Sequence, residues 1–331
     1  MIVTLTPNPS IDRTVTLTGA LARGAVLRAE SVTAQAGGKG VNISRAAVAA
    51  SIPTIAVLPA QKDDPFVVEL LRDGIDCRPE TPAGDVRVNL TLTEPDGTTT
   101  KVNTPGAVVG LRDLDRLATA VTQRARQASW VVLAGSLPPG APDGWYADLV
   151  VALRDTGAKV AVDTSGAPLA ALAARLGEHA PALMKPNGEE LASLTSGDAE
   201  AIEADPATAA AAAVVLVGRG VGAVLVTLGG SGAVLVTDHG AWHAAAPPTT
   251  VVSTVGAGDS SLFGYLLGDL RGVEPPERLR LAVAYGSAAA GLPGTTIPTP
   301  GEIRPELVHI HELDLLPHSH TADNHRELRN R

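Results

Sequence analysis

Residues 252–265 read VSTVGAGDSSLFGY and join a β-branched run to a helix-like sequence through Gly256, Ala257 and Gly258. Small residues at a helix start let the backbone approach a ligand, and the free N–H groups of the first turn form an anion site. A carboxylate at the edge of such an anion site repels a bound phosphate. Asp259 fits there as a general base that accepts a proton from a hydroxyl while the amides stabilise a transferring phosphoryl group. The alternative is a glycine turn with Asp259 as an ordinary helix cap.

A second glycine cluster, GGKG at residues 37–40, precedes another helix-like stretch at residues 41–50. Free N–H groups at this helix start, together with the ammonium group of Lys39, favour an anion site over a plain tight connection. The chain contains no GxxxxGK[ST] pattern and no GxGxxG between a strand and a helix. A Walker A loop is therefore excluded, and a Rossmann dinucleotide site, with the oxidoreductase function that it would imply, is disfavoured.

The composition indicates a globular protein that binds neither nucleic acid nor membranes. Of the 331 residues, 45% are hydrophobic and 2% aromatic, and the net charge is -9. Such a chain is repelled by nucleic-acid backbones and anionic lipids. The N-terminus lacks the pattern of a secretion signal, and the longest apolar run, near residues 209–217, is too short to span a bilayer. We expect a cytoplasmic protein with its single cysteine, Cys77, in the core.

Helices and short apolar strands alternate after Gly110, which predicts a parallel sheet covered by helices. Strands are predicted at residues 2–6, 130–134, 159–163 and 183–185, and helices at 113–128, 143–156 and 169–176. Ligands bind beyond the carboxyl ends of such strands. The polar residues expected at that rim are Asp12, Ser136, Asp163 and Asn187.

A separate small sheet is predicted from three segments, at about residues 12–18, 30–36 and 86–104. Residues 86–94 alternate as VRVNLTLTE, turn at PDG and return as TTTKVN, which is typical of a hairpin. Arg87 and Asn89 share one face of this hairpin, where they either face solvent or turn towards a ligand under a lid. We expect one domain at residues 1–315, followed by a polar, disordered tail at 316–331.

Two further motifs each have a structural and a functional interpretation. Asn187 and Glu190 lie three apart at a helix start, where they form a capping box, hold Mg²⁺ through water, or do both. The glycine turn at residues 228–232 joins two predicted strands, at 221–227 and 233–236. It is either a plain hairpin turn or a cradle for nucleotide phosphates.

Taken together, these motifs resemble the PfkB (ribokinase-like) carbohydrate kinase family over residues 1–310. The resemblance rests on AGGKGVNISRA and STVGAGDS, with RVNLTLTEPDGTTTKVN, GSLPPG, KPNGEE and TLGGSG between them in the family's order. It implies an α/β fold: a ribokinase-like three-layer domain with a mostly parallel central sheet and a small β-sheet lid. It also implies ATP and Mg²⁺ as cofactors, and leaves open whether K⁺ assists.

The resemblance further implies roles for individual residues. Asp259 becomes the catalytic base, and the amides around Gly256, Ala257 and Gly258 the anion hole. The residues that match substrate-binding positions are Asp12, Gly38, Lys39, Asn42, Arg87 and Ser136. Those that match ATP-binding positions are Lys185, Asn187, Thr227, Gly229 and Gly232. Asn187 and Glu190 match the motif associated with Mg²⁺.

Within the family, TPNPSID, GGKGVN and KVNTPG resemble the hexose-phosphate branch. We expect D-fructose 1-phosphate as the acceptor, with Lys39 and Arg87 binding its phosphate. Tagatose 6-phosphate and fructose 6-phosphate are alternative acceptors, and a non-catalytic sugar-phosphate sensor is the alternative of another class. The exposed edges of the lid predict a homodimer.

Overall fold

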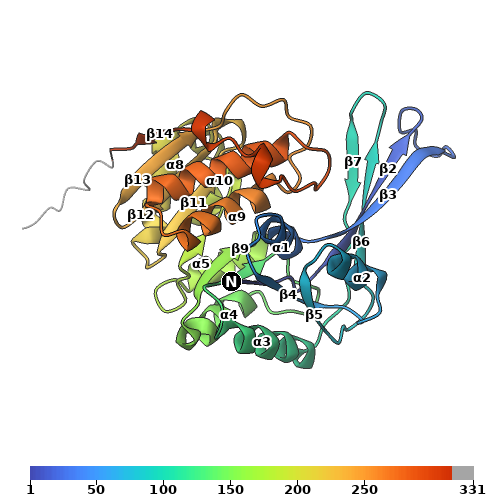
Figure 1. Ribbon diagram of the computed structural model, residues 1–331, viewed down its shortest axis with the longest axis horizontal. Coiled ribbons are helices and arrows are strands. Elements are labelled where there is room, and N and C mark those ends of the chain that lie inside the picture. Colours follow the sequence, from blue (N-terminus) through green and yellow to red (C-terminus); the bar gives the residue numbers. More distant parts are fainter. Residues whose placement is uncertain (315–331) are drawn as a thin grey trace, which may run out of the picture.

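The computed structural model describes residues 1–314, and the tail predicted at 316–331 lies outside the described residues. A large sheet forms the centre of the molecule (Figure 1). In sheet order its strands are β14 (His309–Glu312), β13 (Gly240–Ala245), β12 (Ala233–Thr237), β11 (Ala223–Thr227), β10 (Leu183–Met184), β9 (Lys159–Asp163), β8 (Trp130–Ala134), β1 (Ile2–Leu5), β4 (Thr54–Pro59) and β5 (Asp76–Glu80). The seven strands from β11 to β5 are parallel, and β12, β13 and β14 extend the sheet antiparallel.

Helices cover both faces of this sheet, because successive strand residues point to opposite sides. In β1, Val3 and Leu5 join one buried cluster and Ile2 joins the other. The first cluster includes residues of α3 (Leu111–Ala125), α4 (Trp145–Leu153), α5 (Gly166–Ala174), α6 (Gly188–Thr195), α7 (Ala199–Ala204) and α8 (Pro206–Val217). The second includes residues of α1 (Lys39–Ala49), α9 (Ala257–Leu270) and α10 (Pro275–Ala290). The predicted three-layer α/β fold is confirmed.

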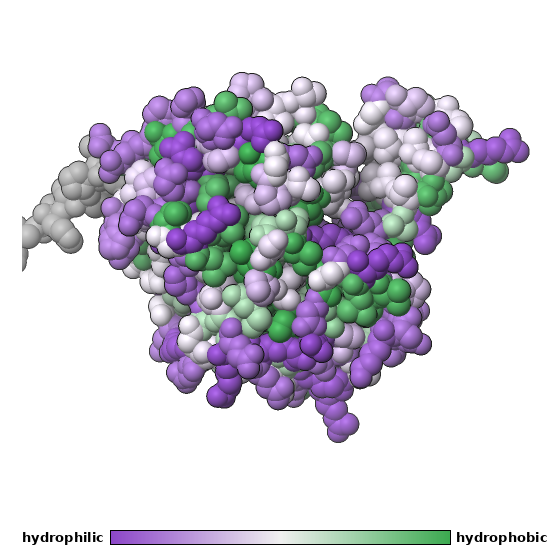
Figure 2. Space-filling view, viewed as in Figure 1, coloured by the Kyte–Doolittle hydropathy of each residue, from purple (hydrophilic) through white to green (hydrophobic). Residues whose placement is uncertain are grey.

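A small second sheet stands to one side of this body, at the right of Figure 1. Its strands, in sheet order, are β3 (Ala29–Gly37), β2 (Ser10–Leu17), β6 (Arg87–Thr93) and β7 (Thr99–Val102). β2 runs parallel to β6, and the two outer strands pair antiparallel. In the space-filling view a narrow gap separates the upper part of this sheet from the body (Figure 2). The small sheet predicted from the sequence is therefore present.

Several elements differ from the sequence-based expectations. Asp12 is the third residue of β2 and does not follow β1 directly, since the Pro7–Pro9 turn is short and pairing resumes at Ser10. Helices α7 and α8 and strands β13 and β14 were not predicted. The apolar residues of α8 show no strong helical periodicity, and β14 is only four residues long.

The expected position of Cys77 in the core is confirmed. Cys77 is buried among the side chains of α1, α2 (Pro65–Arg72) and β4, and burial raises the pKa of its thiol to about 12. Within residues 1–314, no helix combines the length and the apolar character needed to cross a membrane.

Candidate active site

Asp259 lies in the first turn of α9, where it is buried and only 6% exposed. Gly256, with φ of 79°, is the helix cap and provides no side-chain hydrogen bond, so the interpretation of Asp259 as the cap is wrong. The Nδ2 of Asn42 in α1 instead donates to Oδ2 of Asp259 at 2.8 Å. Asn42 follows the glycine cluster at residues 37–40 and Asp259 follows the one at 256–258, so this hydrogen bond joins the two glycine motifs.

The carboxyl group of Asp259 has an unusual acidity for an aspartate. Burial raises its pKa to about 6, with a further contribution from Asp163, against the opposing charges of Lys39 and Lys185 and the hydrogen bond from Asn42. A base whose pKa approaches the working pH is effective in proton transfer. Asp259 is thus suited to remove a proton from a bound hydroxyl near neutral pH.

Asp163, at the carboxyl end of β9, holds two lysines, one at the start of α1 and one directly after β10. The Nζ of Lys39 donates to Oδ1 of Asp163 at 2.6 Å, and the Nζ of Lys185 lies 3.3 Å from Oδ2. Burial alone would raise the pKa of Asp163, but Lys185 and Lys39 lower it below its usual value. Burial alone would likewise lower the pKa of Lys39, but the carboxylates of Asp163 and Asp259 raise it. Asp163 and Lys39 are therefore charged at neutral pH.

A cavity of about 570 Å³ opens beside the start of α9. The predicted ATP-site and anion-hole residues that line it are Asn187, Thr227, Gly229, Gly232, Ala257 and Gly258. Further walls come from residues 246–249 and 251 and from the face of α10 that carries Val283, Gly286 and Ala290. Lys185 is close by, since a Cβ built on Gly258 would lie 3.2 Å from its Nζ. The structure thus brings most of the predicted nucleotide residues to one hollow.

The structural interpretations of the Asn187–Glu190 pair, as a capping box, and of residues 228–232, as a hairpin turn, are both confirmed. Asn187 Oδ1 accepts from the N–H of Glu190 at 2.7 Å, and Glu190 Oε2 accepts from the N–H of Asn187 at 2.9 Å, which is a capping box. β11 and β12 pair antiparallel across residues 228–232, which is a hairpin. Neither feature prevents a ligand role, because the hairpin turn and Asn187 both line the cavity.

The small sheet carries a second polar cluster, which is centred on Asp12 of β2. Asp12 Oδ1 accepts from Ser10 Oγ at 2.8 Å and from Asn89 Nδ2 at 3.0 Å. Gly37 packs directly on this carboxylate, since a Cβ there would lie 2.2 Å from Asp12 Oδ2. Asn89 and Asp12 therefore turn towards each other from adjacent strands.

Arg87 lies at the base of the small sheet, where Nη1 donates to the carbonyl of Thr104 at 2.9 Å and Nη2 to Ser136 Oγ at 3.4 Å. Asn8 reaches the same hydroxyl at 3.4 Å and the carbonyl of Pro105 at 3.0 Å. Three buried polar atoms here lack a partner within residues 1–314: Oδ1 of Asn42, Oδ1 of Asn89 and Nε of Arg87. Such a set of unpaired atoms suits a polar ligand.

Sequence reasoning missed the roles of Asp163 and Asn8. Asp163 follows a predicted strand, and this position marks it as a rim residue, but the sequence does not reveal the two lysines that it holds. Asn8 sits between two prolines and reads as part of a turn. Its partners lie 97 and 128 residues further along the chain, and no local pattern indicates them.

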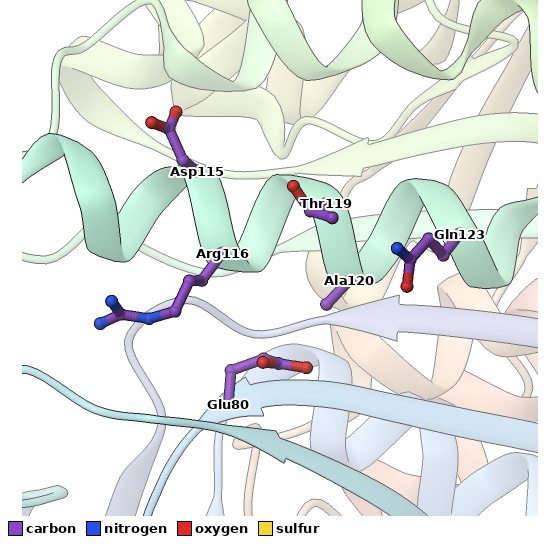
Figure 3. Close-up of a pocket in the computed structure, with 6 residues that line it drawn as sticks. All are labelled: Glu80, Asp115, Arg116, Thr119, Ala120 and Gln123. Atoms are coloured by element: carbon purple, nitrogen blue, oxygen red, sulfur yellow. The ribbon is translucent and has the colours of Figure 1, made fainter.

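Figure 3 shows a second, smaller cavity, of about 280 Å³, between α3 and the end of β5. Its lining residues are Glu80, Asp115, Arg116, Thr119, Ala120 and Gln123. Arg116 is already paired with Asp113, a neighbour on the same helix. None of these residues belongs to the loops around Asp259, and we assign this cavity no role.

A model of pfkB family carbohydrate kinases matches residues 6–301. The chain belongs to this family. A 1-phosphofructokinase of Rhodobacter capsulatus is 36% identical over 304 residues, which make up 90% of this chain and 93% of the relative. The chain also resembles two crystal structures of Escherichia coli phosphofructokinase-2, one with substrates and products and one with potassium. Both give a TM-score of 0.82, at 28% and 27% identity, and cover 91% of this chain and 96% of theirs.

Membership of the pfkB kinases confirms the family identified from the sequence motifs, and with it a carbohydrate kinase that uses ATP. Within residues 1–314, no group of three or more His, Cys, Asp or Glu side chains forms a ready-made metal site.

Proposed function

We propose that this pfkB kinase transfers the γ-phosphoryl group of ATP to the 6-hydroxyl of D-fructose 1-phosphate and forms fructose 1,6-bisphosphate. The observation that carries the proposal is that the start of α9 separates two sites. Ala257 and Gly258 line the 570 Å³ cavity, whereas Asp259 is hydrogen-bonded to Asn42 beside the small sheet. The similarity to the Rhodobacter capsulatus 1-phosphofructokinase supports this acceptor.

Asp259 is the proposed general base. It takes the proton of the acceptor hydroxyl as the oxygen attacks the γ-phosphorus, in line with the leaving group. The N–H groups around Gly256, Ala257 and Gly258 form the anion hole, and the ammonium group of Lys185 lies beside it. Positioning and electrostatic stabilisation of this kind provide most of the catalysis in phosphoryl transfer.

The acceptor is proposed to bind between Asn42, Gly38 and the small sheet. Asp12, held by Ser10 and Asn89, is placed to accept hydrogen bonds from sugar hydroxyls. Arg87 and Ser136 contact each other at the base of the small sheet, and we assign them the phosphate already on the sugar. Lys39 is paired with Asp163 and raised in pKa by Asp259 as well, so it adds positive charge close to the reacting hydroxyl.

ATP is proposed to bind in the cavity, with its phosphates against a loop at residues 228–232, called here the phosphate loop. Within residues 1–314, neither Gly229 nor Gly230 uses its N–H in a hydrogen bond, which leaves these donors free for phosphate oxygens. Thr227 directly precedes this loop and Asn187 pairs with Thr227 in a parallel bridge, and both line the cavity.

Mg²⁺ fits the donors at Glu190. One carboxylate oxygen caps Asn187, and the other is available to a metal-bound water, which agrees with the preference of Mg²⁺ for waters and phosphates over protein cages. When bound, Mg²⁺ neutralises charge on the phosphates of ATP. The potassium complex of E. coli phosphofructokinase-2 supports testing K⁺ as an activator of this kinase too.

The small sheet is proposed to act as a lid that excludes water during transfer. One contact already joins it to the nucleotide side, since Thr295 Oγ1 lies 2.7 Å from Gln35 Oε1 in β3. Thr295 also packs near Gly256 at the start of α9. The lid and the anion hole are therefore linked through one loop.

A homodimer is proposed to form through the lid. β3 and β7 are its two edge strands, and within residues 1–314 neither has a strand partner on its outer side. Val32 on β3 and Val102 on β7 are 58% and 52% exposed. Edge pairing with a second copy would cover these strands and give a closed, two-fold assembly.

The test of the proposed function is ADP release from Mg-ATP with fructose 1-phosphate, fructose 6-phosphate and tagatose 6-phosphate offered in parallel. We expect a kcat/KM at least about tenfold higher with fructose 1-phosphate, because a misplaced phosphate leaves Arg87 without its charged partner. Preference for a 6-phosphate would retain the mechanism and overturn the acceptor. Binding of all three without turnover would indicate a sensor.

A further inference from the structure

His243 in β13 makes a hydrogen bond to the phosphate loop, with its Nε2 2.8 Å from the carbonyl oxygen of Ser231. A carbonyl oxygen only accepts, so Nε2 carries the hydrogen and donates it. Within residues 1–314, this is the one side-chain hydrogen bond that reaches residues 228–232. The other bonds of the loop run between its own backbone groups, from Ser231 to Leu228 and between Gly232 and Gly229 or Leu228.

The loop needs such an external restraint, because three of its five residues are glycine. Glycine has the largest conformational freedom to lose when it is ordered. Gly229 and Gly232 adopt φ of 54° and 91°, and a Cβ on Gly232 would lie 2.0 Å from the carbonyl oxygen of Ala244. The loop therefore rests on β13 beside His243, and this contact sets the direction in which its N–H groups point.

β14 supports the histidine in turn (Figure 1). His311 lies opposite His243 in the antiparallel register of β13 and β14. The two rings are stacked, with centroids 6.5 Å apart and 21° between their planes. The last strand of the described chain thus packs against the side chain that restrains the phosphate loop.

We propose that His243 is a positioning residue for the phosphates of ATP: its bond to Ser231 holds the loop at residues 228–232 in the conformation that binds them. The inference rests on the proposed function, because it takes this loop to contact the phosphates. It assigns His243 no contact with the nucleotide. Its effect is confined to nucleotide affinity and leaves the acceptor site on the far side of Asp259 unchanged.

The experiment compares His243→Leu with His243→Gln, whose amide nitrogen retains a donor near the position of Nε2. The matched control is His239→Leu, which changes an exposed histidine in the turn of the same β-hairpin. ATP affinity is measured by calorimetry without acceptor, and KM and kcat are measured in the coupled assay. Thermal unfolding shows that each variant is folded.

We expect His243→Leu to weaken ATP binding about fivefold and to raise the KM for ATP by the same factor. This change corresponds to the loss of one neutral hydrogen bond. The kcat and the KM for the acceptor should not change, and His243→Gln should restore ATP binding to within about twofold of the wild type. If His243→Leu fails to fold, His243→Ala takes its place. Equal ATP affinity in wild type and the Leu or Ala variant would overturn the positioning role alone. A wild-type protein that binds no ATP would overturn the proposed function as well.

Discussion

Asp259 carries a buried carboxyl group whose raised pKa, about 6, affects stability as well as catalysis. A carboxyl group with a raised pKa stabilises the folded state at pH values below its unfolded pKa, and this contribution is lost as the pH rises through the folded pKa. At pH 7.5 the ionised form is therefore less favourable in the folded than in the unfolded chain.

We expect Asp259→Asn to lower kcat about 10²–10⁴-fold, the usual contribution of a general base. The same change should raise the free energy of unfolding at pH 7.5 by about 1–3 kcal/mol, since a neutral side chain replaces a disfavoured charge. The gain should shrink as the pH falls below 6, where the wild-type carboxyl is itself protonated. Urea unfolding at pH 7.5 and at pH 5 measures this gain in stability and its dependence on pH. An unchanged kcat would remove Asp259 from the base role.

Asp163 influences this acidity through its charge and through the lysines that it holds. It raises the pKa of Asp259 directly, whereas Lys39 and Lys185 lower it. In Asp163→Asn, loss of the nearby negative charge should lower the pKa of Asp259, and the acidic limb of the kcat–pH profile should move to lower pH. The kcat on the plateau should fall, because the base is weaker and both lysines lose a partner.

The profile is measured at saturating ATP and acceptor, so that kcat reports groups of the bound complex. This matters because the phosphate of a sugar phosphate itself titrates near pH 6. Assays run well below the melting temperature of the variant, since an unpaired buried lysine is destabilising. An acidic limb that stays in place would contradict the assignment of this limb to Asp259.

Helices α9 and α10 pack so closely that there is no room for a side chain at Gly264, one of the glycines between them. A Cβ on Gly264 would lie 2.5 Å from the carbonyl oxygen of Leu281 and 2.9 Å from the Cα of Ala282. These are backbone atoms, which cannot rotate away. Since α9 begins with the proposed anion hole and α10 lines the cavity, a change in their spacing acts on the site.

We expect Gly264→Ala to lower the free energy of unfolding by about 1–3 kcal/mol through overpacking. The better helix propensity of alanine, worth about 1 kcal/mol, works in the other direction and is too small to compensate. The kcat should fall as well. Gly301→Ala, where a Cβ meets nothing within 4 Å, is the control and should leave both quantities unchanged. A Gly264→Ala protein of wild-type stability would show that the two helices can move apart freely.

Element types were predictable where the local pattern was strong. The strands at 130–134 and 159–163 lie at the predicted residues, because uniform apolar runs bounded by turns leave little choice. Helix α8 was missed, since its alanines are apolar on every side and show no amphipathic stripe. β14, with two histidines in four residues, forms a strand only because β13 offers it an edge.

At the scale of the whole molecule, we expect the lid to hold two chains together. Size-exclusion chromatography with light scattering should give a mass about twice that of one chain, the commonest closed assembly. Val32→Lys together with Val102→Lys should shift the protein to the monomer, because like charges on the edges of the sheet oppose pairing. Val151→Lys, which alters a partly exposed valine of α4, serves as the control. A wild-type monomer at micromolar concentration would contradict the proposal.

The candidate site was predictable as a set of residues but not as a set of contacts. Glycine-rich helix starts mark Asp259 and Asn42 in the sequence, and the structure shows that their side chains meet across 217 residues. Lys39 was expected to bind the phosphate of the substrate, and in the structure it pairs with Asp163. Such pairings depend on how distant strands are ordered in the sheet, which no local pattern encodes.

The sheet order also has a consequence for translation. β1, which leaves the ribosome before either of its neighbours, lies between β4 and β8 in the finished sheet. β4 follows within 60 residues, but the second partner is complete only once Ala134 has been added. Until then the nascent protein displays one unpaired side of Ile2–Leu5, four residues that are fully buried in the native state. Pairing of this strand is therefore completed late in synthesis, and until then its unpaired edge is open to aggregation with other chains.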